Sequence, residues 1–172
     1  MKIIDLGKEL YQGMEVFPGD PDFEIGEIHT IDSHGWNLST IKIGLHTGSH
    51  LDAPYHMDPK GKTIDQIPLT NTVCQALKTK NLDKVKENLG LIIDFPLDQD
   101  QVEKLLKLRP SFVGGDLDQE VERRLLQAGI ITYTDLENID LLPYDQIFLF
   151  VGQPLKIRNG DGSPVRPLAI FL

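Results

Sequence analysis

Alternation of apolar and polar residues predicts a β-hairpin in the first quarter of the chain. Phe23–His29 alternates with one slip of phase, and Leu38–Leu45 alternates more cleanly. A period of two is typical of a half-buried strand. The polar segment Asp32–Gly35 lies between the two runs, so we expect them to pair. The second strand then leads directly into a segment rich in histidine, His46–His56.

The rest of the chain mixes short apolar runs with two helical patterns. Asp98–Leu106 predicts an amphipathic helix with an acidic start, and Gln119–Gly129 predicts a helix that a glycine closes. Four further runs are strand-like: Leu91–Phe95, Phe112–Asp116, Ile130–Tyr133 and Ile147–Val151. Strands interspersed with a few helices indicate an α/β domain built on a mixed sheet.

A second hairpin is predicted near the C-terminus. Leu155–Arg158 has the composition of a short strand, and Asn159–Gly162 is a strong turn signal. We therefore expect Val165–Phe171 to return as the partner strand.

The histidine-rich segment holds most of the candidate chemistry. In an extended chain, side chains of the same parity share a face, and four chemically active ones do so here: His46, His50, Asp52 and His56. Gly48 allows the chain to fold His46 back towards the others. Two imidazoles and one carboxylate suit Zn²⁺, Mn²⁺ or Fe²⁺ and leave open positions for water, while His56 is placed to exchange a proton.

Length and composition narrow the possible functions. The 172 residues correspond to about one domain, which we take as residues 1–172. The net charge of −9 argues against nucleic acid or an anionic membrane as partner. The single cysteine, Cys74, excludes tetrathiolate zinc sites and leaves nitrogen and oxygen as metal ligands. No signal peptide or membrane-spanning run is evident, so we expect a cytoplasmic protein.

The segment resembles the H-x-G-T-H-x-D-x-P-x-H signature of the cyclase family of metal-dependent hydrolases, which includes formamidases and isatin hydrolases. Ser49 stands where threonine is usual and keeps the hydroxyl. The resemblance continues in Phe17–Asp20, Gly61–Asp65 and Asp161–Arg166, so it spans nearly the whole chain.

This resemblance implies a role for each residue of the signature. His46, His50 and Asp52 would hold a divalent metal, most simply Zn²⁺ with Mn²⁺ as the alternative, and His56 would be the general acid and base. It also implies a swivelling β/β/α fold with a barrel-like core, and a homodimer or homotetramer. The substrate would be a small molecule with an amide-type bond, such as an N-formyl aryl amine or a cyclic amide.

The second half of the chain departs from the family pattern. Binuclear members carry a further histidine and glutamate there, and the corresponding positions are Glu122 and Thr134. Glu122 is a candidate ligand, although its arginine neighbours favour a solvent-facing side chain. Asp135 and Glu137 are further candidates, although both are typical of acids in loops. Three alternatives follow: the site holds one metal, one of these carboxylates replaces the missing ligands, or the protein retains metal binding without catalysis.

Four further residues are weaker candidates, in this case for the wall of a substrate pocket. Phe17, Pro18 and Trp36 could form an aromatic wall or belong to the core, and Arg166 could hold a carboxylate or pair with a structural aspartate. Two functional hypotheses follow: a metal-dependent amidohydrolase, or a non-catalytic metal-binding or regulatory module.

Overall fold

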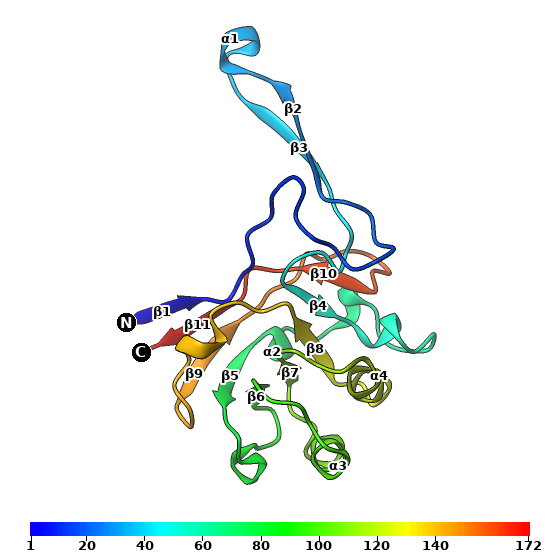
Figure 1. Cartoon of the computed structure of the whole chain (residues 1–172), viewed down its shortest axis with the longest axis vertical. Coiled ribbons are helices and arrows are strands. Elements are labelled where there is room, and N and C mark those ends of the chain that lie inside the picture. The colour runs from blue at the N-terminus through cyan, green and yellow to red at the C-terminus, as the bar shows by residue number, and fades with distance from the viewer.

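One large mixed sheet forms the body of the protein, and two strands form a separate hairpin (Figure 1). The computed structural model describes residues 1–172. The order across the large sheet is β1 (Lys2–Asp5), β11 (Leu168–Phe171), β9 (Ile147–Val151), β5 (Val73–Lys78), β6 (Gly90–Ile92), β7 (Phe112–Gly114), β8 (Ile131–Thr134), β4 (His50–Asp52) and β10 (Gly162–Pro164). The hairpin consists of β2 (Glu24–His29) and β3 (Leu38–Lys42).

Helices are few and short. They are α1 (Ile31–His34), α2 (Leu69–Thr72), α3 (Gln99–Leu108) and α4 (Gln119–Gln127), with the 3₁₀ helices η1 (Pro54–His56), η2 (Ile64–Gln66), η3 (Leu82–Lys84) and η4 (Ile139–Leu141). The pairs β5–β6, β6–β7 and β7–β8 are parallel, and all other pairs are antiparallel. The sheet curls into a half-barrel, and the predicted α/β class with a mixed sheet is confirmed (Figure 1).

Two apolar clusters hold the body together. One fills the curl of the sheet, where the rings of Phe112, Tyr133 and Phe150 pack with centroids 4.3 to 4.9 Å apart. The other includes Leu105 of α3 and Leu125 of α4, together with Leu91 and Val113 from β6 and β7. These clusters bury the apolar side chains that the sequence pattern places on strands and helices.

Both predicted helices are present, and their ends follow from local chemistry. Asp98 caps α3 and forms a capping box with Gln101, and Arg109 ends the helix in a left-handed conformation. Asp118 caps α4, and Gly129 follows it with a φ of 81°. The predicted N-terminal hairpin is also confirmed, with a register shift between Glu27 and His29.

The predicted C-terminal hairpin is wrong. No strand forms over Leu155–Arg158, and the predicted return strand divides into a loop and β11. The intervening β10 pairs with β4, while β11 pairs with β9 and β1. Pro167 cannot donate a backbone hydrogen bond, which favours a break there. The turn signal in Asn159–Gly162 reports only nearby residues. Pairing with strands far away in the sequence decided which strands β10 and β11 join.

None of the helices in the structure has the length and apolar character required to cross a membrane.

Candidate metal centre

Strand β4 carries the histidine segment into the middle of a three-stranded region. It lies between β8 and β10, and the register places His50 opposite Thr134 and Asp52 opposite Thr132. Paired residues project to the same face of a sheet. The side chains around His50 and Asp52 are therefore set by two strands that lie about 80 and about 110 residues later in the chain.

Gly48 makes the turn that brings His46 back to this strand. Its φ is 66°, a left-handed conformation that glycine adopts at no steric cost, and a Cβ there would lie 2.5 Å from Leu10. The Gly48 carbonyl accepts a hydrogen bond from His50 Nδ1 at 2.6 Å. This contact directs His50 Nε2 towards Asp52, as is typical of a histidine that ligates a metal through its other nitrogen.

Asp52 is the centre of the hydrogen-bond network. Its side chain is 1% exposed, and Oδ1 lies 2.7 Å from His46 Nδ1 and 3.3 Å from His50 Nε2. Burial opposes the charge on Asp52, but hydrogen bonds from the two imidazoles hold its pKa well below the usual range. The carboxylate therefore stays charged inside the protein, as a metal ligand must.

His46 lies between two carboxylates. Its Nδ1 faces Asp52, and its Nε2 lies 3.1 Å from Asp161 Oδ2. Burial opposes a charge on His46, but the carboxylates outweigh burial and raise the pKa of His46 to about 9. The pKa of His50 is also raised, because Asp52 outweighs its burial. A divalent cation that binds here would displace these protons.

Asp161 joins the site, and the sequence pattern assigned it only to a turn. Its Oδ2 lies between His46 Nε2 and His56 Nδ1, which is 3.5 Å away. Burial would raise the pKa of Asp161, but the hydrogen bond with His46 lowers it. The one signal for Asp161 was its place at the start of the family-like segment Asp161–Arg166.

The donor chemistry fits a divalent metal. His46, Asp52 and His56 each offer a ligand atom, and these atoms lie within 4.8 Å of one another. His50 extends the group through its contact with Asp52. Nitrogen and carboxylate oxygen in this arrangement suit Zn²⁺ or Mn²⁺.

Glu122 reaches the same network from α4. Its Oε1 lies 2.8 Å from the hydroxyl of Thr132, which is also 3.2 Å from Asp52 Oδ2. Burial and the neighbouring Asp52 carboxylate raise the pKa of Glu122 to about 7. The interpretation of Glu122 as a solvent-facing residue is wrong. Successive helical residues point about 100° apart, so Glu122 faces Thr132 while Arg124 points elsewhere and pairs with Glu103.

The candidate residues at the end of β8 and just after it take different positions. Thr134 lies in the site, with its hydroxyl 2.9 Å from His50 Nε2. The exposed Asp135 carboxylate lies 3.5 Å from Lys8 Nζ, and Glu137 is exposed. The structure thus brings together Glu122 and Thr134, at the two positions where the family pattern differs, and directs Asp135 towards Lys8.

The residues proposed to line a substrate pocket are dispersed. Phe17 and Pro18 are exposed in the loop before β2, and Trp36 is exposed near the tip of the hairpin that points away from the sheet (Figure 1). Arg166 contacts Asp5 through two nitrogens at 2.7 and 2.9 Å, the structural pairing that was the alternative to substrate binding.

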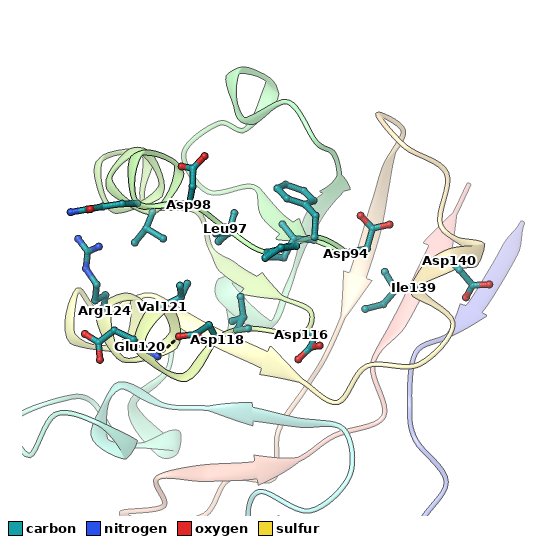
Figure 2. Close-up of a pocket in the computed structure, with 16 residues that line it drawn as sticks. Asp94, Leu97, Asp98, Asp116, Asp118, Glu120, Val121, Arg124, Ile139 and Asp140 are labelled. Carbon is teal, nitrogen blue, oxygen red and sulfur yellow. Dashed lines mark hydrogen bonds between the residues drawn. The ribbon is translucent and has the colours of Figure 1, made fainter.

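One sizeable cavity of the structure does not contain the histidine segment. It measures about 950 Å³ and lies between α3 and α4 beyond the ends of β6 and β7, lined by acids such as Asp94, Asp98 and Asp116 (Figure 2). Glu120 and Arg124 on α4 face it, whereas Glu122 contacts the histidine network. We place the candidate centre by its donor chemistry, because cavity size alone assigns no reaction.

Replacement of Gly162 tests how the site is packed. A Cβ at Gly162 would lie 2.5 Å from His46 Cε1, so we expect Gly162→Ala to displace the ring from its two carboxylates. In metal-free protein the pKa of His46 should then fall from about 9 towards 6.5, as an NMR titration of the ring protons would measure. Gly160→Ala is the control, since its methyl would meet Ile157 at 3.2 Å. An unchanged pKa in Gly162→Ala would contradict this packing.

Comparison with known proteins gives consistent matches. The family model described as "Putative cyclase" matches residues 4–107, a range that includes His46–His56 and ends before α4 and β8. Kynurenine formamidase from Salinibacter ruber is 27% identical, and the alignment covers 96% of both chains. Kynurenine formamidase from Bacillus cereus (strain ATCC 10987) is 28% identical over 95% of this chain and 94% of its own.

Solved structures share the fold. Isatin hydrolase A from Labrenzia aggregata, bound to benzyl benzoate, superposes with a TM-score of 0.82 at 22% identity, over 98% of this chain and 93% of that chain. A structure described as a potential metal-dependent hydrolase with cyclase activity gives a TM-score of 0.75 at 24% identity, over 98% and 96%.

Proposed function

Because the chain belongs to the cyclase family, we propose that it is a metal-dependent hydrolase that cleaves an amide-type carbon–nitrogen bond in a small molecule. The observation that carries the proposal is the convergence of His46, Asp52 and His56 within 4.8 Å, with His50 against Asp52. The names of the curated relatives, which are kynurenine formamidases, support the reaction class.

The proposed ligands are His46, His50 and Asp52, and Zn²⁺ is the preferred ion with Mn²⁺ as alternative. Exposure of the side chains differs within the segment: it is 1% for Asp52, 10% for His50, 20% for His46 and 30% for His56. The charged ligand is thus sealed from water, while His56 is accessible to a substrate. This gradient suits a metal held inside and an acid–base group at the mouth.

The bound ion would lower the pKa of water and polarise the carbonyl group under attack. His56 would accept the proton of the attacking water and donate it to the leaving nitrogen. Asp161 lies 3.5 Å from His56 Nδ1 and would orient that imidazole. Asp52 would keep His46 and His50 in place through its hydrogen bonds to both rings.

The proposed substrate class is an N-formyl aryl amine or a cyclic amide. Both contain one small carbonyl group attached to nitrogen, so hydrolysis adds water across a single bond and gives an acid and an amine. We propose one metal ion per chain, because the neutral hydroxyl of Thr134 is a poor ligand for Zn²⁺ or Mn²⁺.

Metal analysis tests the centre. Protein stripped with chelator and incubated with Zn²⁺ or Mn²⁺ should bind about one ion per chain, and its melting temperature should rise, since a ligand at 100 times its Kd adds about 2.7 kcal/mol of stability. Fewer than about 0.2 ions per chain with either metal would refute the centre and the mechanism.

A substrate panel tests the reaction on the metal-loaded protein. N-formyl aryl amines, cyclic imides, lactones and isatin should include at least one compound that is hydrolysed. If all remain intact while the metal is bound, the second candidate gains: a metal-binding module without catalysis, which Glu122 and Thr134 at the altered positions would favour.

A further inference from the structure

The cavity between α3 and α4 opens where two parallel strands end (Figure 2). Strands β6 and β7 run in the same direction, and the lining residues Asp94 and Asp116 each lie two residues beyond the end of one of them. Open α/β sheets bind small molecules in crevices outside the carboxyl ends of parallel strands. The position of this cavity in the fold therefore suits a ligand, and the hydrolysis proposed above makes no use of it.

Apolar side chains form the walls of the cavity. Val102 is buried, and four more are partly buried against the apolar cluster that includes Leu105: Phe95, Leu97, Leu117 and Val121. These four side chains pack against the core on one side and line the cavity on the other. At about 950 Å³ the cavity falls within the range of roughly 300 to 1,000 Å³ that is typical of small-molecule sites.

Negative charge dominates the lining. The acids are Asp94, Asp98, Asp116, Asp118, Glu120 and Asp140. Arg124 is the one basic residue that lines the cavity, and it donates a hydrogen bond of 2.5 Å to Glu103, which neutralises its charge. A cation is therefore attracted to the cavity, and an anion is repelled.

Three of these acids already serve the local structure. Asp94 Oδ2 lies 3.0 Å from Nζ of the buried Lys78. Asp98 and Asp118 accept hydrogen bonds from backbone amides in the first turns of α3 and α4. A positively charged side chain and two helix amino ends thus offset these three carboxylates, which leaves little of their charge for a ligand.

Two acids remain free for a cation. Glu120 pairs with Arg123 at 3.5 Å, whereas Asp116 and Asp140 are exposed and form no ion pair. Figure 2 shows both towards one end of the cavity, with Arg124 at the other end. The cavity therefore combines apolar walls with unpaired negative charge at one end.

We propose that this cavity binds a small organic cation, in which a protonated amine is attached to an apolar or aromatic body. The ammonium group would lie at Asp116 and Asp140, and the body would pack against walls such as Val121. Helix α4 separates the cavity from the candidate metal centre, because Glu122 contacts Thr132 while Val121 lines the cavity. The proposed binding is therefore independent of the metal and of the hydrolase reaction.

Three probes that share a phenyl ring and differ in charge test the proposal by NMR. They are the cation 2-phenylethylammonium, the neutral 2-phenylethanol and the anion 3-phenylpropanoate. The cation should shift the backbone amides of residues 94–102 and 116–124 and leave those of His46–His56 in place. It should bind at least about fivefold more tightly than the alcohol, because two exposed carboxylates contribute about twofold each, and the anion should bind most weakly.

Asp116→Asn/Asp140→Asn removes the charge that the proposal assigns to the ligand. The affinities for the cation and for the alcohol should then come within about twofold of each other, while the protein stays folded, since both side chains are exposed. Glu15→Gln/Asp22→Asn is the control, because it removes the same charge at exposed residues before β2. This control should keep the wild-type preference for the cation.

Several outcomes would overturn the proposal. They are a preference for the cation that survives Asp116→Asn/Asp140→Asn, an equal loss of preference in the control, and shifts confined to His46–His56. If Mg²⁺ shifts the amides of α3 and α4 while 2-phenylethylammonium does not, the acids attract metal ions instead. Metal-stripped and Zn²⁺-loaded protein should bind the cation with affinities within about twofold of each other, so failure of the metal centre would not affect this test.

Discussion

Asp52→Asn is expected to abolish metal binding and, with it, hydrolysis. The substitution keeps the shape of the side chain and removes the charge that accepts hydrogen bonds from His46 and His50. A neutral amide oxygen is a weaker ligand than a carboxylate, so we expect metal affinity to fall at least about 100-fold and turnover to fall about 1,000-fold or more. Isothermal titration with Zn²⁺ and a steady-state assay would measure the two effects.

Asp135→Asn is the matched control for this substitution. Both aspartates were candidate ligands, but Asp135 lies beside Lys8 and is about half exposed. Its replacement should leave metal affinity and turnover within about twofold of wild type, because an exposed pair of this kind contributes little. If Asp135→Asn lost as much metal affinity and turnover as Asp52→Asn, the assignment of Asp135 as a residue outside the centre would be wrong. The geometry around Asp52 would not be contradicted by that result. Circular dichroism would establish that Asp52→Asn is folded.

His56→Ala is expected to separate catalysis from metal binding. His56 lies on η1 at the exposed end of the site, and its removal takes away the proposed proton carrier. Loss of a general acid–base group typically lowers the rate by roughly 100- to 10,000-fold. The decrease should appear in kcat, while one metal ion per chain remains bound.

Free imidazole gives this variant a diagnostic readout. Added imidazole should restore part of the rate of His56→Ala if the missing ring transferred protons. Loss of the metal from His56→Ala would instead identify His56 as a metal ligand. The ligand atoms of His46, Asp52 and His56 lie within 4.8 Å of one another, so this alternative is consistent with the geometry. Turnover equal to wild type would exclude His56 from the reaction.

Glu122 illustrates the limit of local sequence patterns. The charge of its neighbours suggested a solvent-facing position, yet the rotation of α4 turns Glu122 towards Thr132 and Asp52. Helical periodicity separates the faces of α4, but it does not say which polar residue faces a distant strand. That choice depends on how α4 packs against β8.

Asp161 and Thr134 illustrate the same limit in the sheet. Each side chain reaches the histidine segment because β10 and β8 pair with the two edges of β4. The sequence predicted a local hairpin for the segment around Asp161, because turn signals report only nearby residues. Pairing between strands more than 80 residues apart leaves no comparable local pattern.

The sequence alone therefore determined the features that depend on near neighbours: the two capped helices, the N-terminal hairpin and the spacing of His46, His50, Asp52 and His56. Their chemistry is contained in eleven consecutive residues with one glycine turn. The tertiary structure decided which carboxylates and hydroxyls surround them and which apolar surfaces remain uncovered. Those features depend on strand register and helix packing between residues that are far apart in the sequence. Register and packing are set jointly, because the whole chain must bury its apolar surface at once.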